Sequence, residues 1–139
     1  MFLARLIYTS EVVEGFDQLD IESILSVARE RNAALNVTGV LFFNSRYFLQ
    51  CLEGSRSNIN AIYHRILNDS RHTNPVLLDY REIAERDFSA WQMGYIAETQ
   101  KTRDLYRQFS PVSDFNAYRM SGESCYRLLK QMATSAPML

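Results

Sequence analysis

Residues 37–52 of the chain read VTGVLFFNSRYFLQCL and consist of two apolar runs that meet at Asn44 and Ser45. Both of these residue types are common in tight turns, and the runs on either side are rich in residues that favour strands. The stretch therefore predicts two antiparallel strands, over residues 37–44 and 46–52, that form a hairpin. Apolar residues point to both sides of this hairpin, so we expect the fold to cover both of its faces.

Gln50 interrupts the apolar character of the second strand. Side chains alternate along a strand, so Gln50 shares one face with Phe48 and Leu52. A buried amide that lacks a hydrogen-bonding partner costs about 1 to 3 kcal/mol. Gln50 therefore reaches solvent, if it lies at a strand edge, or it has a partner inside the fold.

The hairpin lies between two candidate helices, and further candidate strands precede and follow them. In chain order the expected elements are a strand over 2–9, a helix over 17–31, the hairpin, a helix that Ser57 caps and that ends near Asn68, and strands over 76–83 and 90–97. Apolar residues recur with helical spacing in both helices. This βαββαβ order with a fifth strand predicts an α+β, ferredoxin-like fold whose two helices pack on one face of the sheet.

The second face of the sheet also carries apolar residues, and the C-terminal segment can cover them. A short helix is expected over about 102–109 and a longer one after Ser121, with an apolar stripe of Cys125, Leu128, Leu129 and Met132. We expect residues 1–98 to form one unit and residues 99–139 to be a helical cap within the same globular domain. The residues after Ser135 are expected to be frayed.

The composition excludes several functions. A length of 139 residues suits one domain. The 15 basic and 16 acidic residues give a net charge of −1 without a basic run, so we expect neither nucleic acid nor a membrane surface as a partner. No signal peptide or membrane span is recognisable, which favours a cytoplasmic protein. Cys51 and Cys125 have no metal-ligand spacing, so no metal is expected.

Tyr8, near the end of the first strand, is the expected neighbour of Gln50. The first and third strands are adjacent in the βαββαβ order, and both side chains have reason to face the helices. A phenol and an amide are complementary, since each can donate and accept a hydrogen bond. Either the two groups satisfy only one another, or a third component binds beside them.

Other polar and aromatic residues border the same slot between the expected helices. Asn32 ends the first helix, and the rest of the set is Arg65, Asp69, His72, Trp91 and Met93. Trp91 and Met93 are expected to share one face of the last strand. Each residue has an ordinary reading as a helix cap, an i, i+4 ion pair, a surface residue or core. Together they border an apolar slot with a polar rim, which is typical of an aromatic cofactor site.

The same residues occur in stretches that resemble the BLUF domains, the flavin-binding sensors of blue light. The stretches are RLIYTS with Tyr8, ARERNAALNVTGVL with Asn32, YFLQCLEG with Gln50, YHRILNDSRH with Arg65, Asp69 and His72, and WQM with Trp91 and Met93. The resemblance covers about residues 2–97. The length is similar to that of the short members, in which two C-terminal helices cover the sheet.

The resemblance implies a non-covalent flavin, usually FAD with FMN or riboflavin as other possibilities, whose ring lies between the two helices. Asn32 would bind the polar edge of the ring. Arg65, Asp69 and His72 would contact its pyrimidine side or the ribityl chain, where a cation favours carbonyl oxygens and a carboxylate accepts from hydroxyls.

The resemblance also implies a photochemical role for four residues. Tyr8 would give an electron and a proton to the excited flavin. Gln50 would relay this transfer and be left rotated, tautomerised or both. The signal would pass through Trp91 and Met93 to the C-terminal helices. Without an effector domain, the output would go through a protein partner, a homo-oligomer, or both.

Two positions depart from the family pattern, and three alternative functions remain. Arg31 stands where some members have Asn, and Asn36 stands where Gly is common, although Asn tolerates a left-handed backbone. An acylphosphatase-like hydrolase would need an anion-binding loop where residues 10–14 are acidic, and an RNA-binding sheet would need a basic platform. A flavin-free interaction module would keep the fold and lack the pocket. We do not expect an enzyme.

Overall fold

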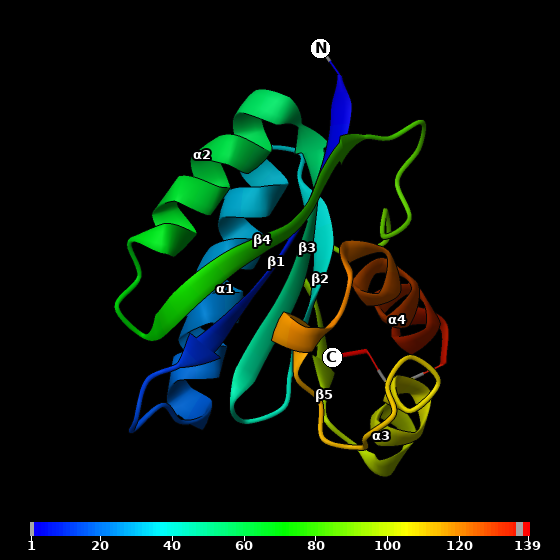
Figure 1. Cartoon of the computed structure of the whole chain (residues 1–139). Helices are drawn as coiled ribbons and strands as arrows, with labels where there is room; N and C mark the ends of the chain where they lie inside the picture. The colour runs from blue at the N-terminus through cyan, green and yellow to red at the C-terminus, as the bar shows by residue number, and fades with distance from the viewer. Residues whose placement is uncertain (1, 136–137) are drawn as a thin grey trace.

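The structure, a computed structural model, describes residues 2–135 and 138–139, which form a five-stranded sheet between two helical layers (Figure 1). The strands are β1 (Leu3–Val12), β2 (Thr38–Phe43), β3 (Tyr47–Ser55), β4 (His72–Glu82) and β5 (Gly94–Ala97). The helices are α1 (Gln18–Ala34), α2 (Arg56–Leu67), α3 (Gln100–Tyr106) and α4 (Gly122–Ser135), with a short 3₁₀ helix over Ala117–Arg119.

The strands lie in the order β4-β1-β3-β2-β5. Neighbouring strands are antiparallel except β2 and β5, which are parallel. The first and third strands are therefore adjacent at the centre of the sheet, as predicted, and Tyr8 on β1 lies directly opposite Gln50 on β3. The hairpin of β2 and β3 is also confirmed, with Ser45 in a left-handed conformation at its turn.

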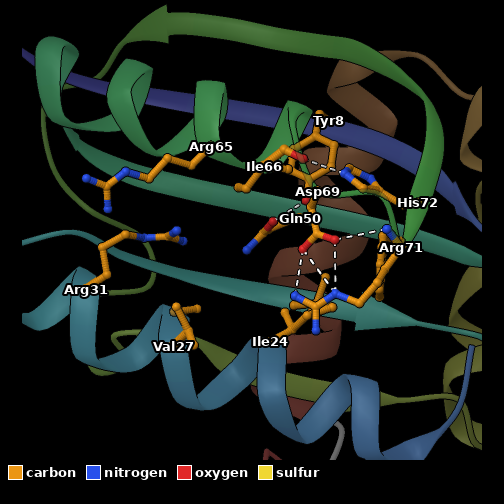
Figure 2. Close-up of a pocket in the computed structure, with 13 residues that line it drawn as sticks. Tyr8, Ile24, Val27, Arg31, Gln50, Arg65, Ile66, Asp69, Arg71 and His72 are labelled. Carbon is orange, nitrogen blue, oxygen red and sulfur yellow. Dashed lines mark hydrogen bonds and ion pairs between the residues drawn. The ribbon is translucent and has the colours of Figure 1, made fainter.

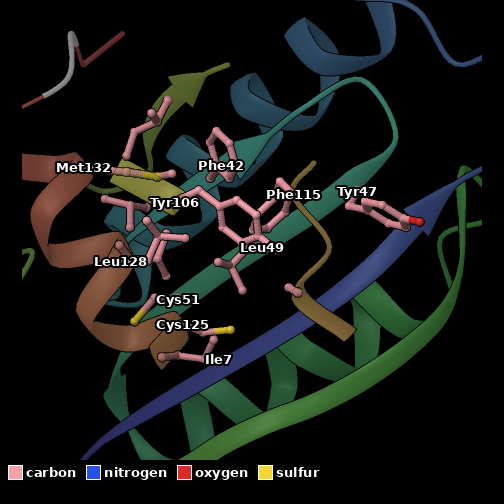
Figure 3. Packing of buried hydrophobic residues seen from close by; sticks show 14 of the residues in the cluster. Ile7, Phe42, Tyr47, Leu49, Cys51, Tyr106, Phe115, Cys125, Leu128 and Met132 are labelled. Carbon is pink, nitrogen blue, oxygen red and sulfur yellow. The ribbon is translucent and has the colours of Figure 1, made fainter. Parts of the chain in front are cut away.

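Each face of the sheet packs against one pair of helices (Figure 1). Under α1 and α2 lies a core that includes Tyr8, Phe48 and Leu52, which we call the front face. Under α3 and α4 lies a second core, the back face, in which β-sheet residues such as Leu49 pack against the α4 stripe (Figure 3). The ferredoxin-like fold and its C-terminal cover are thus confirmed.

Local sequence signals explain most of the helix boundaries. Asp17 caps α1 in a capping box with Asp20, and the Ser121 hydroxyl accepts from the Ser124 N–H at the start of α4. The cap of α2 is Ser55 rather than Ser57, because β3 continues to Ser55 and leads directly into the helix. Asn36 lies two residues after the end of α1 and has a φ of 54°, which is the left-handed conformation expected at this position.

Several predicted boundaries were wrong. α1 continues three residues beyond Arg31, so Asn32 lies inside the helix instead of at its end. β4 begins at His72, which therefore lies in a strand and not in a loop. α3 spans Gln100–Tyr106, earlier than predicted, because Thr99 forms its capping box.

The last strand is shorter than predicted, since β5 starts at Gly94. Trp91 and Met93 precede it and lie on opposite faces: Trp91 packs against the back-face core, whereas Met93 belongs to the front-face core. The carbonyls of Gln92 and Met93 accept hydrogen bonds from side chains of α1, and the Trp91 carbonyl accepts from the Gly39 N–H of β2. The expected alternation of a strand does not apply to these residues.

The expectation that the residues after Ser135 are frayed is partly wrong. Residues 136 and 137 lie outside the described part of the chain. Met138 and Leu139 lie on the sheet, where Leu139 exchanges two backbone hydrogen bonds with Tyr95 of β5. No helix in the described part of the chain is long and apolar enough to span a bilayer.

Candidate functional site: a slot between α1 and α2

The floor of the slot is a hydrogen-bonded series of three side chains from three segments. The Tyr8 hydroxyl donates to Oε1 of Gln50, and Nε2 of Gln50 donates to Sδ of Met93 at 3.3 Å. All three side chains are buried. The amide of Gln50 therefore has a definite orientation, with its oxygen towards the phenol and its nitrogen towards the thioether.

Burial keeps the Tyr8 phenol protonated. Desolvation raises the pKa of Tyr8 well above the usual value, and the nearby Tyr63 and Asp69 raise it further against the opposing effect of Arg31. The hydroxyl therefore keeps its hydrogen, which it donates to Oε1 of Gln50.

An open pocket lies above this floor, between the two front helices (Figure 2). The space between its lining atoms, including the part open to solvent, is about 590 Å³. Ile24, Val27 and Ala28 of α1 form one wall, and Ile66 lies opposite them. The remaining lining residues are Tyr8, Arg31, Leu41, Phe48, Gln50, Arg65, Asp69, Arg71 and His72. Two apolar walls over a polar floor suit a flat aromatic ring.

At one end of the pocket Asp69 pairs with Arg71 through three contacts between 2.7 and 3.2 Å. These hydrogen bonds lower the pKa of Asp69 and raise the pKa of Arg71, so both groups remain charged. The suggested ion pair between Arg65 and Asp69 is not formed. Arg71 was missed in the sequence, although its spacing of two residues from Asp69, outside a helix, was available as a signal.

At the other end lie Arg31 of α1 and Arg65 of α2, whose side chains run in opposite directions in Figure 2. No carboxylate among the described residues pairs with either guanidinium, and Nε of Arg31 is buried without a partner there. Burial lowers the pKa of Arg31, and the charge of Arg65 lowers it further. Two cations without counter-ions favour an electron-rich or anionic group between them.

His72 lines the pocket but uses both ring nitrogens within the protein. Nε2 lies 2.6 Å from the Ile66 carbonyl and Nδ1 lies 2.7 Å from the Ser10 hydroxyl. A carbonyl can only accept, so Nε2 carries the hydrogen of that bond. His72 holds the end of α2 against β1, and a ligand can meet its ring face.

Asn32 does not line the pocket; it is fully buried beside the segment that leads into β5. Its Nδ2 donates to the Gln92 carbonyl at 2.6 Å, and its Oδ1 has no partner among the described residues. A buried acceptor without a donor costs about 1 to 3 kcal/mol, so a ligand that donates a hydrogen bond there would be stabilised. A flavin has one such donor, the N–H of its pyrimidine ring.

The sequence profile of the BLUF family, described as sensors of blue-light using FAD, matches residues 3–94. The chain belongs to the BLUF family. The family is one of blue-light sensors, which favours a sensor over the hydrolase alternative. A flavin is the cofactor of the family, and the unpaired polar atoms described above are compatible with that group.

Two curated relatives of this BLUF protein are considerably longer. It is 33% identical over 113 residues to the photoactivated adenylate cyclase subunit beta of Euglena longa, an alignment that covers 81% of this chain and 13% of that protein. It is 41% identical over 80 residues to the blue light- and temperature-regulated antirepressor BluF of Escherichia coli (strain K12), covering 56% of this chain and 20% of that one. The chain thus spans a fifth or less of these relatives.

Two solved BLUF structures are similar to this chain over almost the whole length of both proteins. The photo-activated state of BlsA has a TM-score of 0.89 at 27% identity and covers 99% of this chain and 98% of its own. The dark state of BlrB, a BLUF protein, has a TM-score of 0.79 at 29% identity, with 98% of both chains covered. The shared structure therefore includes α3 and α4.

Proposed function

We propose that this protein is a blue-light receptor that binds a flavin non-covalently in the slot between α1 and α2. The proposal rests on the series from Tyr8 through Gln50 to Met93 on the floor of the slot. A buried amide held by a phenol on one side and a thioether on the other can change partners without large movements of the backbone. A ring in the slot would lie against that amide and sense its arrangement.

Different residues around the slot would contact different parts of the flavin. The apolar walls would take the faces of the ring, and Oδ1 of Asn32 would accept from its pyrimidine N–H. Arg31 and Arg65 would contact electron-rich oxygens, while Asp69, held by Arg71, would accept from ribityl hydroxyls. His72 would contribute its ring face, because both of its nitrogens are engaged.

The flavin would supply absorption of blue light and, once excited, an acceptor for an electron. Tyr8 would give up an electron and, through Gln50, its proton, and would take both back, so that no atom is gained or lost. Turning the Gln50 amide exchanges its donor and acceptor ends, and Met93 Sδ then loses the N–H that it accepts. Tautomerisation would change the same contacts.

FAD is the expected flavin, and FMN and riboflavin have the same ring. The cation pair of Arg31 and Arg65 lies where it can attract phosphoryl oxygens as well as carbonyls, which favours FAD and FMN over riboflavin. The flavin-free interaction module is disfavoured because it would leave Asn32 Oδ1 and Arg31 Nε buried without partners.

The output would pass from Met93 and Trp91 to the C-terminal helices over residues 99–139. Trp91 packs against the back-face core that α3 and α4 complete, so a shift of the segment before β5 reaches that core directly. We propose a downstream protein partner, a homo-oligomer, or both as the receiver, and a cytoplasmic location.

The deciding experiment is an absorption spectrum of the purified protein in darkness and under blue light. We expect a yellow protein with an oxidised-flavin spectrum that shifts to the red under illumination and returns in darkness. A colourless protein that does not take up FAD, FMN or riboflavin would contradict the proposal. So would a bound flavin whose spectrum does not change in light.

A further inference from the structure

The last two residues of the chain occupy the outer edge of β5, and we call Met138–Leu139 the strap. The N–H of Leu139 donates to the Tyr95 carbonyl at 2.9 Å, and the N–H of Tyr95 donates to the Leu139 carbonyl at 3.2 Å. This reciprocal pair is the pattern of antiparallel strands. Since β2 pairs with the other edge of β5, the strap covers the edge at which the sheet would otherwise end (Figure 1).

The side chain of Met138 packs over Gly94 and against the back-face core. A Cβ atom at Gly94 would lie 2.5 Å from Sδ of Met138, so glycine provides the room for this contact. Leu139 itself is 67% exposed. Two backbone hydrogen bonds with Tyr95, the Met138 side chain and one hydrogen bond from Arg29 hold the strap, which is a weak attachment compared with a buried strand.

Arg29 of α1 joins the strap to the segment that carries Met93. Its Nε donates to the Met93 carbonyl at 3.0 Å, and its Nη2 donates to the Leu139 carbonyl at 2.8 Å. One turn later on the same helix, Asn32 holds the Gln92 carbonyl. Two side chains of α1 thus hold the backbone before β5, and one of them, Arg29, also holds the strap.

Three hydrogen bonds therefore connect the slot to the strap, and they are linked through the side chain and backbone of Met93 and through the guanidinium of Arg29. Gln50 donates to the Met93 side chain, Arg29 holds the Met93 backbone, and the other arm of Arg29 holds Leu139. A change of the Gln50 amide removes the first of these contacts and frees Met93 to move. Arg29 donates to Met93 and to Leu139 at once, so a shift of the Met93 carbonyl would alter the position of the guanidinium that also holds Leu139.

We propose that the strap covers the β5 edge in the dark and is released when Gln50 rearranges in light, which leaves that edge free to pair with an extended strand of a partner protein. An uncovered edge presents unpaired N–H and C=O groups, which bind other strands by main-chain hydrogen bonds. The proposal rests on the light-sensing function proposed above, but docking of the strap in the dark does not.

The first test uses NMR to measure the hydrogen-exchange rate of the Tyr95 amide. The rate is compared between the full chain and a chain that ends at residue 137. In darkness the full chain should protect this amide, and the shortened chain should exchange it about tenfold faster, as expected for the loss of its hydrogen bond. Illumination should speed exchange in the full chain to the rate of the shortened one. Equal rates in the two chains in darkness would overturn docking of the strap.

Arg29→Gln tests the connection, with Arg127→Gln as the matched control. Arg127 is an exposed arginine on α4 whose ion pair is with Glu123, four residues away. We expect Arg29→Gln to speed exchange at Tyr95 in darkness by about tenfold, the effect of losing a charge-assisted hydrogen bond, and Arg127→Gln to leave it unchanged. Unaltered exchange in Arg29→Gln would overturn the role of this residue.

A labelled peptide with the sequence of residues 134–139, TSAPML, tests whether the edge accepts a strand. Fluorescence anisotropy should show binding to the chain that ends at residue 137, no binding to the full chain in darkness, and binding to the full chain in light. A scrambled peptide is the control. Absence of binding to the shortened chain would overturn the proposed pairing.

The absorption spectrum separates failure of the inference from failure of the proposed function. A full chain with a normal red shift but the same Tyr95 exchange in darkness and light would overturn release of the strap and leave the photoreceptor intact. A full chain without a red shift would overturn the photoreceptor, and with it the release by light.

Discussion

Among the described residues, the buried polar groups on the back face of the sheet have partners within the protein, whereas two on the front face do not. On the back, the buried carboxylate of Glu53 accepts from the Thr38 hydroxyl and from the N–H groups of Asp87 and Phe88 at 2.6 to 3.0 Å. On the front, Asn32 Oδ1 and Arg31 Nε are buried and lack partners among the described residues. Of these two neighbouring residues of α1, Arg31 lines the slot, whereas Asn32 is buried beside the segment that leads into β5.

The same strands build both faces. Along β3, Leu49 and Cys51 point into the closed back-face core, while Phe48 and Gln50 point to the slot. Burial raises the pKa of Cys51 and of Cys125, which behave as packing residues at the back. Because side chains alternate along β3, one face of the strand can pack in a closed core while the other face lines the slot.

The largest expected effect on this comparison comes from Gln50→Leu, with Cys51→Ala as its control on the opposite face. The leucine cannot accept from Tyr8 or donate to Met93, so we expect a flavin-bound protein whose normal red shift is abolished. Cys51→Ala should keep the shift. Absorption difference spectra measure both, and a normal photocycle in Gln50→Leu would refute the role assigned to the amide.

Leu128→Ala is the corresponding change at the back. This fully buried side chain on α4 contributes to the back-face core, and its truncation should lower the free energy of unfolding by about 2 to 5 kcal/mol. Urea unfolding measures the loss. The red shift should persist in the folded fraction, and its disappearance there would show that the two faces are not separate in function.

Met93→Ala and Trp91→Ala compare the two faces at one bend of the chain. Met93 accepts from Gln50, whereas Trp91 packs on the back. We expect Met93→Ala to change the rate of dark recovery by about tenfold, equivalent to one hydrogen bond of about 1.4 kcal/mol. Trp91→Ala should keep the shift and alter recovery less. A larger effect of Trp91→Ala on recovery of the spectrum would reverse the assignment.

Arg31→Gln has the smallest expected effect. Removal of one cation of the pair should weaken FMN binding by up to about tenfold, as for a partly exposed charge-assisted contact, and should affect riboflavin less. Quenching of flavin fluorescence gives both affinities. The control is Arg46→Gln, because Arg46 pairs with Glu11 at the hairpin turn away from the slot. Equal weakening for FMN and riboflavin would assign Arg31 to the ring instead of the phosphoryl group.

The sequence alone was sufficient for the element order, the adjacency of β1 and β3, the β2–β3 hairpin and the two-faced packing. These depend on local periodicity and on turn chemistry, which a short window of residues contains. The pairing of Tyr8 with Gln50 followed from the same order, because the strand arrangement that it predicts puts those residues opposite one another.

Other features depended on contacts between distant segments. Arg71 and not Arg65 pairs with Asp69, Asn32 binds the Gln92 carbonyl, and His72 uses both nitrogens inside the protein. Each of these side chains had several possible hydrogen-bonding or ion-pair partners in the sequence. Spacing along the chain does not rank such partners, because the distances between them are set only when the helices dock on the sheet.

By itself, the sequence predicted that Gln50 lies beside the Tyr8 phenol, since strand periodicity is local and the βαββαβ order implies that the first and third strands are neighbours. Only the tertiary structure decided that Met93 reaches this amide, that Trp91 lies on the opposite face, and that the strap rests on β5. The physical reason is that the backbone before β5 is held by Arg29 and Asn32 of α1, which lie 64 and 60 residues from their partners Met93 and Gln92, and spacing along the chain does not predict such contacts.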